Sequence, residues 1–140
     1  MKKSNLITIL IVLLLGSCNK SDINKTTVDH DSMMVRIAEI EIEPESLDGY
    51  LTILKEEAEA SVRLEPGVIC IYPMYQNDNP NQIRLLEIYA NKEAYQSHLQ
   101  TPYFKHYKTA TLPMVKSLRL IDMTAIDPET MSQIFSKISH

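Results

Sequence analysis

The spacing of apolar residues changes several times along the chain, and each change predicts a new element. Residues 33–43 (MMVRIAEIEIE) alternate apolar and polar positions with period two, which predicts a strand. The alternation changes phase midway, because the apolar positions move from odd to even numbers after Ile37. We therefore expect a bulge near Ala38, which would keep all the apolar side chains on one face.

A helix is predicted over residues 45–64, where apolar residues recur every three or four positions. Its apolar stripe comprises Leu47, Leu51, Leu54, Ala58 and Val62. The charged residues between them are expected to face water, and these are Lys55, Glu56, Glu57 and Glu59. Glu65-Pro66-Gly67 ends the helix, because proline cannot continue it and glycine favours a turn.

The remaining elements follow in a regular order. Strands are predicted over 68–76, 83–90 and 115–125, a turn over 77–81, and helices over 92–100 and from 102 to about 113. Pro73 places the second strand at a sheet edge or a bulge, since proline lacks a backbone donor. Asn91 and Thr101 are expected to cap the two helices. The order β-α-β-β-α-β predicts an α+β, ferredoxin-like fold with an antiparallel sheet, followed by a C-terminal helix.

The N-terminus has the pattern of a secretory signal. Lys2-Lys3 precede an apolar run, Leu6 to Leu15, which as a helix would rise about 15 Å, half the thickness of a bilayer core. The next residues, Leu15-Gly16-Ser17-Cys18, resemble a bacterial lipobox, in which the cysteine becomes diacylated. The pattern predicts a signal peptide over 1–17 and a lipoprotein held by Cys18 in the bacterial cell envelope, in the outer membrane or facing the periplasm.

The rest of the chain divides into three parts. Residues 18–32 are polar and lack a clear period, which is typical of a flexible linker. Residues 33–126 form the expected domain, and 127–140 a C-terminal helical extension.

Composition excludes several functions. The net charge of −4 argues against nucleic-acid binding, and the three glycines form no phosphate-binding loop. The two cysteines lie too far apart for a C-x-x-C zinc or redox pair, and no metal ligand set is spaced along the chain. Cys70 is interpreted as a small apolar filler and His106 as a solvated histidine.

Four segments together resemble the antibiotic biosynthesis monooxygenase family, which includes cofactor-free quinol monooxygenases. They are Glu65-Pro66-Gly67, Leu86-Glu87-Ile88-Tyr89, Ala94-Tyr95-Gln96-Ser97-His98-Leu99 and Thr101-Pro102-Tyr103-Phe104. The resemblance covers Met33 to about Met123. It implies a dimeric α+β barrel whose sheets meet back to back, with a pocket between sheet and helices in each subunit. It also implies oxidation of a quinol or phenol by molecular oxygen with no cofactor. Tyr89 stands where the family often has tryptophan.

The candidate site follows from these segments. His98 is the expected general base, since imidazole titrates near neutrality, although a buried histidine with a hydrogen-bonding partner is the alternative. Glu87 is the second candidate catalytic residue: it would orient His98 or form an ion pair with Arg84 or Arg119. The expected pocket walls are aromatic, and they comprise Tyr72, Tyr89, Phe104 and Tyr107. Aromatic strand residues also serve simply as core.

Three functions remain open at this point. The first is a monooxygenase acting on a small quinol-like aromatic molecule and oxygen. The second is a non-catalytic envelope lipoprotein that binds a small molecule, and the third an isomerase of a small carbonyl compound. A homodimer is expected in each case, because Val68, Cys70 and Tyr72 alternate with Ile69 and Ile71 and so make both faces of that strand apolar.

Overall fold

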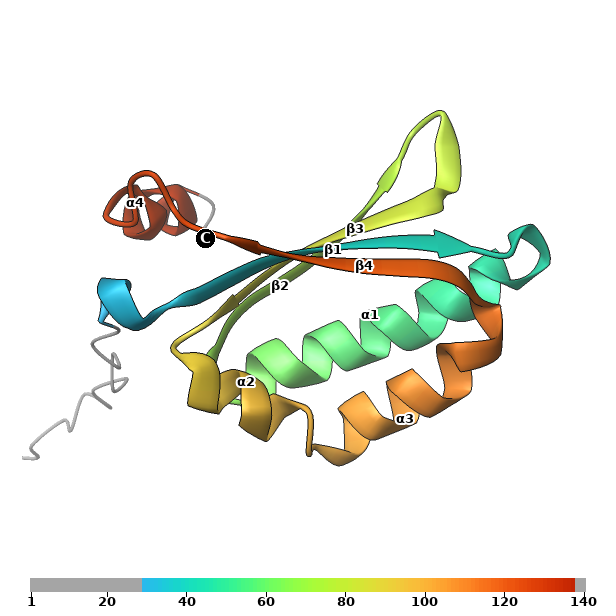
Figure 1. Cartoon of the computed structure of the whole chain (residues 1–140), viewed down its shortest axis with the longest axis horizontal. Helices are drawn as coiled ribbons and strands as arrows, with labels where there is room; N and C mark the ends of the chain where they lie inside the picture. Colours follow the sequence, from blue (N-terminus) through green and yellow to red (C-terminus); the bar gives the residue numbers. More distant parts are fainter. Residues whose placement is uncertain (1–28, 138–140) are drawn as a thin grey trace, which may run out of the picture.

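The protein folds into one antiparallel sheet with three helices packed on one face (Figure 1). The computed structural model describes residues 29–137. The sheet order is β2-β3-β1-β4, with strands β1 (Met34–Ile42), β2 (Val68–Gln76), β3 (Asn79–Tyr89) and β4 (Val115–Met123). The helices are α1 (Leu47–Leu64), α2 (Lys92–His98), α3 (Pro102–Thr111) and α4 (Thr130–Ser136). Single 3-10 turns occupy His30–Ser32, Pro44–Ser46 and Leu112–Met114. The predicted ferredoxin-like α+β fold is confirmed.

β1 crosses the middle of the sheet without the expected bulge. Ala38 pairs in register with Leu85 of β3 and with Leu120 of β4, and the only shift in either β1 pairing falls between Glu41 and Ile42 on the β4 side. The prediction of a bulge near Ala38 is wrong. Both faces of this strand accept apolar side chains, so the odd and even positions face opposite sides and no bulge is needed to reconcile them.

The β2–β3 hairpin is tighter than expected. Gln76 pairs with Asn79, so only Asn77 and Asp78 form the turn. β2 lies at an edge of the sheet, as the proline at position 73 predicts.

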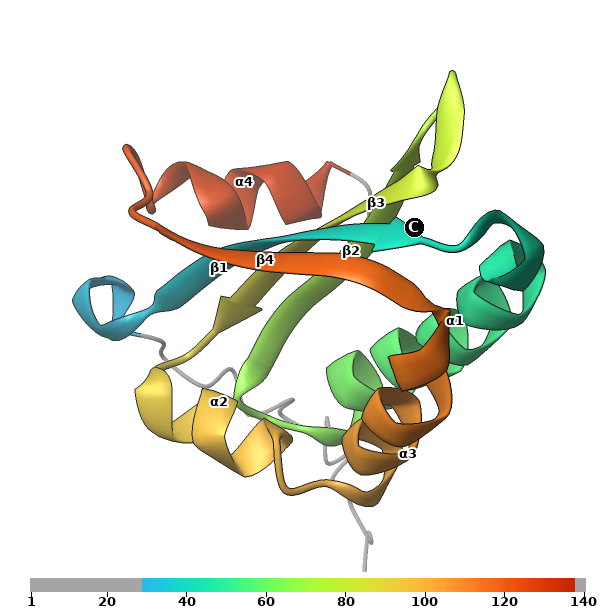
Figure 2. The same ribbon diagram turned by 45° about the vertical axis from the view of Figure 1, so that its right-hand side comes forward.

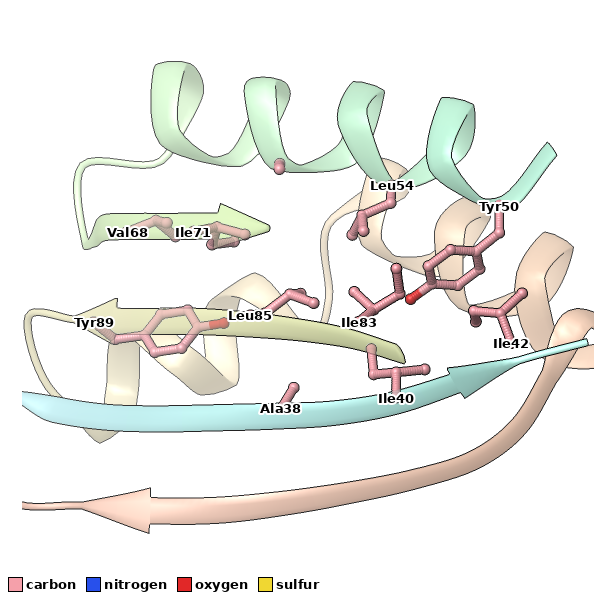
Figure 3. Close-up of a cluster of buried hydrophobic side chains, with 11 residues drawn as sticks. Ala38, Ile40, Ile42, Tyr50, Leu54, Val68, Ile71, Ile83, Leu85 and Tyr89 are labelled. Atoms are coloured by element: carbon pink, nitrogen blue, oxygen red, sulfur yellow. The ribbon is translucent and has the colours of Figure 1, made fainter. Parts of the chain in front are cut away.

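The inner face of the sheet, defined as the face covered by α1, α2 and α3, carries the core. Even-numbered residues of β1 and odd-numbered residues of β3 point toward α1 (Figure 3). The buried apolar residues between the sheet and α1 include Ile40, Ile42, Ile83, Leu85, Tyr50 and Leu54. Each such side chain stabilises the fold by about 1.5–3 kcal/mol relative to an exposed one.

The outer face of the sheet is only partly covered. α4 lies on this side, opposite α1, α2 and α3 (Figure 2). Cys70 and Ile88 are buried on the outer face, but Tyr72, Met74 and Met123 are between 41% and 60% exposed. This face therefore carries apolar surface that the described chain does not bury.

The expected signal peptide 1–17 and Cys18 lie outside the described residues. The end of the expected linker is structured, because residues 30–32 form a 3-10 turn and Ser32 Oγ donates to the carbonyl of Ala90 at 3.1 Å. Within residues 29–137, no helix combines the length and apolar character needed to cross a bilayer.

Candidate functional site

His98 is the last residue of α2, and two N-cap residues fix where α2 begins and where α3 follows it. Asn91 Oδ1 accepts a hydrogen bond from Ala94 N at 2.8 Å and starts α2. Thr101 Oγ1 accepts from Phe104 N at 3.3 Å and donates to the carbonyl of His98 at 2.8 Å, so α2 ends and α3 begins within three residues. Both predicted caps are confirmed. The turn leaves the His98 side chain 3% exposed.

Two carboxylates face the two ring nitrogens of His98. Nδ1 lies 2.9 Å from Oε1 of Glu65, and Nε2 lies 3.6 Å from Oε1 of Glu57. Ser61 Oγ donates to the same oxygen of Glu57 at 2.7 Å. The side chains of Glu57 and Glu65 are 5% and 11% exposed. His98 is thus a buried histidine with carboxylate partners, and it joins α2 to the C-terminal half of α1.

Glu57 corrects the predicted solvent-facing surface of α1. It was expected to face water, but it is buried on the same stripe as Tyr50, Leu54 and Ser61. These residues follow the spacing of three and four positions that defines one helix face. The predicted stripe of aliphatic residues from Leu47 to Val62 missed it, whereas a stripe started at Tyr50 would have included it.

The Glu65-Pro66-Gly67 segment does more than end α1. A Cβ atom at Gly67 would lie 2.5 Å from Cβ of Ala94, so only glycine lets this loop pack so closely on α2. Ala90 N donates to the carbonyl of Gly67 at 2.8 Å and fixes the contact. The close approach brings the carboxylate of Glu65 to His98.

Aromatic rings enclose His98 as expected, with one exception. The ring of His98 lies 4.7 Å from that of Phe104 and 5.5 Å from that of Tyr89. Tyr107 contacts Phe104 at 6.2 Å, and its hydroxyl lies 2.8 Å from the hydroxyl of Tyr50. Two of the four predicted wall residues, Tyr89 and Phe104, therefore contact the candidate base, and Tyr107 contacts Phe104.

Tyr72 is the exception, because it points away from His98. It pairs with Leu86 on the outer face and is 60% exposed. The β2–β3 register shifts between Val68 and Cys70, which places Val68 and Ile71 on the inner face and Cys70 and Tyr72 on the other. Strict alternation along β2 was the wrong assumption, since a bulge reverses the parity of every later residue. Cys70 is nevertheless buried, as expected of a small filler.

Glu87 lies on the inner face of β3, where it pairs with Arg36 of the neighbouring strand β1. The hydroxyl of Tyr89 donates to its Oε2 at 3.4 Å. Burial raises the pKa of Glu87, although the charges of Arg36 and His98 oppose this rise. The expected pairing with Arg84 or Arg119 is wrong.

Those two arginines lie on the outer face and bind Glu39 instead. Arg84 Nε lies 3.6 Å from Oε1 of Glu39, and Arg119 Nε donates to its Oε2 at 2.8 Å. The odd-numbered position of Glu39 on β1 puts its side chain on the face opposite Glu87.

Burial also raises the pKa of Glu57, against the opposing effects of Ser61 and His98. Glu57 and Glu87 are therefore two interior carboxyl groups that hold a proton more readily than an exposed glutamate. Burial raises the pKa of Tyr107 to about 12, and the pKa values of Tyr50 and Tyr89 are raised as well, mainly by burial. These tyrosines therefore stay protonated, and the hydroxyl of Tyr89 acts as a donor to Glu87. The arrangement can accept a proton from a weakly acidic ligand while keeping its own hydroxyls neutral.

A hollow of about 510 Å³ opens at the edge of this cluster. Its lining includes Arg36, Tyr95, Lys92, Gln96 and Asp122. The guanidinium of Arg36 lies 4.7 Å from the centre of the Tyr95 ring, and its Nε and Nη2 donate to Oδ1 of Asp122 at 2.8 and 2.7 Å. Tyr95 in turn contacts Tyr89 at 5.2 Å, so ring contacts connect the hollow to His98.

Sequence reasoning missed Arg36, Tyr95, Glu57 and Glu65 as members of the site. Glu65 belongs to a motif that was interpreted as a helix stop and as part of the family resemblance, with no role for its side chain. Arg36 was read as a polar position of an alternating strand, and only the pairing with Glu87 shows that it faces inward. His106 is exposed, as predicted. No group of three His, Cys, Asp or Glu residues in the described part of the chain is arranged to hold a metal ion.

Comparison with known proteins places the chain in a family. The model of the antibiotic biosynthesis monooxygenase family matches residues 33–110. A candidate antibiotic biosynthesis monooxygenase from Bacteroides thetaiotaomicron is 48% identical with a TM-score of 0.71, and the match covers 72% of this chain and 96% of that one. A candidate monooxygenase from Lactobacillus acidophilus is 33% identical with a TM-score of 0.64, covering 66% of this chain and 44% of that one.

A candidate antibiotic biosynthesis monooxygenase from Nitrosomonas europaea has the same fold at 18% identity, with a TM-score of 0.65 and coverage of 69% and 92% of the two chains. No protein of curated function matches the chain. The matched segment contains β1, β3, α1 and α2 and all but the last residue of α3, the elements that build the His98 site. This chain belongs to the antibiotic biosynthesis monooxygenase family.

Proposed function

We propose that the protein oxidises a small quinol or phenolic aromatic compound with molecular oxygen and without a cofactor. One observation carries the proposal: a buried histidine, flanked by Glu57 and Glu65 and enclosed by aromatic rings, lies inside a fold shared with monooxygenases. Such a cluster can remove a phenolic proton, and the resulting anion is electron-rich enough to reduce oxygen by itself.

The hollow beside Arg36 and Tyr95 is the proposed substrate entrance. Leu118 and Leu120 on the inner side of β4 are 57% and 47% exposed, so this edge of the interior is accessible to an apolar ring. The phenolic proton passes to Glu87 or, by way of Glu57, to His98, and the cation of Arg36 stabilises the anion that forms. The anion donates electrons to oxygen, and the ring peroxide that results loses water. One oxygen atom stays in the quinone product and the other leaves as water, so the substrate supplies all the electrons.

Oxygen consumption tests this proposal. Menadiol added to the purified protein should raise oxygen uptake above the autoxidation blank, and simple phenols should yield quinones that carry label from isotopically labelled oxygen gas. Heat-denatured protein is the control. Uptake equal to the blank with every quinol and phenol tested would refute the proposal.

A non-catalytic binding function is the second candidate, because an apolar groove of about 600 Å³ lies between α1 and β2. Its walls include Leu51, Ala58, Val62, Ile71, Pro73 and Tyr75. This volume lies within the usual range for small-ligand sites. If menadione raises the melting temperature but menadiol produces no oxygen uptake, the binding function is favoured.

We also propose that two copies pair through the outer face of the sheet, which carries exposed apolar residues. Tyr72→Glu would place a charge in that interface and should convert a dimer to a monomer in light scattering. Tyr75→Glu is the matched control, since Tyr75 is similarly exposed but lies on the opposite face of the same strand. A wild-type protein that is monomeric at micromolar concentration contradicts the pairing.

Anchoring in the bacterial envelope through Cys18 remains a proposal that rests on the Leu15-Gly16-Ser17-Cys18 sequence. Cys18→Ser should abolish incorporation of labelled fatty acid, and Cys70→Ser should leave it unchanged. Two acyl chains are enough for stable membrane residence. Continued labelling of the Cys18→Ser protein would refute the anchor.

A further inference from the structure

Glu65 connects two different environments. On one side its Oε1 lies 2.9 Å from Nδ1 of the enclosed His98. On the other side it lines a surface hollow of about 540 Å³, together with Ser97, Thr101 and Tyr103. Its side chain is 11% exposed, compared with 3% for His98. Glu65 is therefore the member of the cluster that water in the hollow can reach.

Glu57 is the inner member of the same cluster. Its side chain is 5% exposed, and Ser61 holds the carboxylate oxygen that faces Nε2 of His98. Glu57 is buried on the same stripe of α1 as Tyr50 and Leu54, which pack into the core, so this carboxylate faces the interior. Glu57, His98 and Glu65 thus lie in order from the interior to the hollow.

An imidazole ring can gain a proton at one nitrogen and lose one at the other. In His98 the nitrogen that faces inward is 3.6 Å from Glu57, and the nitrogen that faces outward is hydrogen-bonded to Glu65. The outer transfer is within hydrogen-bond distance, and the inner transfer needs Nε2 and Oε1 of Glu57 to approach from 3.6 Å to about 3 Å. We propose that Glu57, His98 and Glu65 form a relay that carries a proton between the enclosed site and solvent.

The relay rests on the proposed function, in which a phenolic proton is released inside the protein and a proton is needed later to form water. In the outward direction Glu57 passes a proton to Nε2, the proton on Nδ1 moves to Oε1 of Glu65, and Glu65 releases it to water in the hollow. In the inward direction the same steps run in reverse when the peroxide is cleaved. One proton leaves and one returns in each cycle, so the starting tautomer of His98 is restored and no electrons move through the relay.

Hydrogen exchange distinguishes a relay from a structural clamp. In a relay Glu65 delivers protons to Nδ1 of His98, so Glu65→Gln should slow exchange of that ring proton with solvent by about tenfold or more. In a clamp the hydrogen bond only protects the proton, so the same substitution should accelerate exchange. The exchange rate is measured by NMR on the full protein with isotopically labelled histidine. Glu56→Gln is the matched control, because Glu56 is exposed on the same helix.

Glu65→Asp keeps the carboxylate on a shorter side chain and covers the case in which the glutamine protein does not fold. The relay predicts exchange at Nδ1 that is slower than in the wild type, because the acceptor is further away, and faster than in a folded glutamine variant. Unchanged or faster exchange in a folded Gln or Asp variant would overturn the relay.

Menadiol oxidation separates this proposal from the proposed function. If the wild type consumes oxygen, Glu65→Gln should lower the rate of oxygen uptake about tenfold and increase its solvent isotope effect. For Glu65→Asp, both quantities should lie between those of the wild type and of the glutamine variant. If the wild type consumes no oxygen, the proposed function fails, but the exchange measurement still decides whether Glu65 carries protons to His98. If oxygen uptake is normal and exchange is unaffected in Glu65→Gln, the relay alone is wrong.

Discussion

The two ends of the layer between the sheet and α1 contain opposite chemistry. Near the start of α1 the layer is mainly aliphatic and carries no charge, with Ile40, Ile42, Leu54 and Ile83 buried around Tyr50 (Figure 3). Toward the end of α1 the same layer holds charged and hydrogen-bonding groups, namely Glu57, Ser61, Glu87, His98 and Arg36. Helix α1 and strands β1 and β3 extend through both ends. The two ends therefore differ in their side chains and not in their backbone structure.

The difference indicates which end is devoted to stability. Burial of aliphatic groups stabilises the fold directly, whereas burial of ionisable groups has a desolvation cost that their mutual attraction offsets only in part. Apolar residues of the same size would fill the space at the polar end without this desolvation cost. The buried charges are therefore best explained by function, and substitutions at the two ends should have different consequences.

The largest effect is expected for His98→Ala. Loss of a positioned base should lower menadiol oxidation per folded molecule by about a hundredfold or more. The substitution also leaves Glu57 and Glu65 without their shared partner, and we expect a loss of about 3–5 kcal/mol in urea unfolding. His106→Ala, an exposed histidine on α3, should change neither quantity. A stability loss with a normal rate per folded molecule would make His98 purely structural.

Leu54→Ala tests the aliphatic end. Removal of this buried side chain should leave a cavity and lower the free energy of unfolding by about 2–5 kcal/mol. Oxidation per folded molecule should stay at the wild-type value, because Leu54 has no polar role. Equal losses of rate and stability would show that the two ends are coupled.

Gly67→Ala tests the loop that brings Glu65 to His98. The new methyl group would meet Ala94 at 2.5 Å, so we expect a loss of about 1–3 kcal/mol and a weaker His98–Glu65 contact. Gly49→Ala is the matched control. The nearest atom to its new methyl group is Cε of Met114 at 3.8 Å, and in helix α1 alanine should stabilise the protein by about 0.5–1 kcal/mol. Equal thermal stability of the two variants would contradict the close approach.

The smallest effect is the pH dependence of Glu87→Gln. Burial raises the pKa of Glu87 in the folded protein, so the wild type loses stability as the pH rises from the unfolded value of about 4.5 through the higher folded value. Glutamine does not titrate. The urea midpoint of the variant relative to the wild type should therefore increase from about pH 4 to about pH 8. A decrease would show that the charges of Arg36 and His98 dominate over burial.

Local sequence signals were reliable where the physical cause is local. The caps at Asn91 and Thr101, the edge position of Pro73 and the order of elements all follow from backbone donors, fixed φ angles and hydrophobic period. His98, Tyr89, Phe104 and Tyr107 were found through the resemblance of their segments to a family, and the structure brings them together.

Errors occurred where a side chain's direction depends on a distant partner. The bulge expected at Ala38 is absent because both faces of β1 carry some apolar side chains. Tyr72 points outward because of a register shift that β2 acquires only in pairing with β3. Glu57 was predicted to face water, since a charged residue in a helix usually does, and Arg36 was not singled out at all. Only the tertiary structure shows that Arg36 lies beside Glu87 and that Glu57 faces His98 in the interior.

The amino-acid sequence by itself determined the order and type of the elements, the ferredoxin-like fold and the family, because periodicity, caps and short motifs act over a few neighbouring residues. Tertiary structure alone decided that Glu57 and Glu65, eight positions apart on the chain, meet His98 from two sides. It also decided that Arg36 opposes Glu87. These pairings depend on strand register and on the close approach at Gly67, and both are set by contacts between segments that are far apart in the chain.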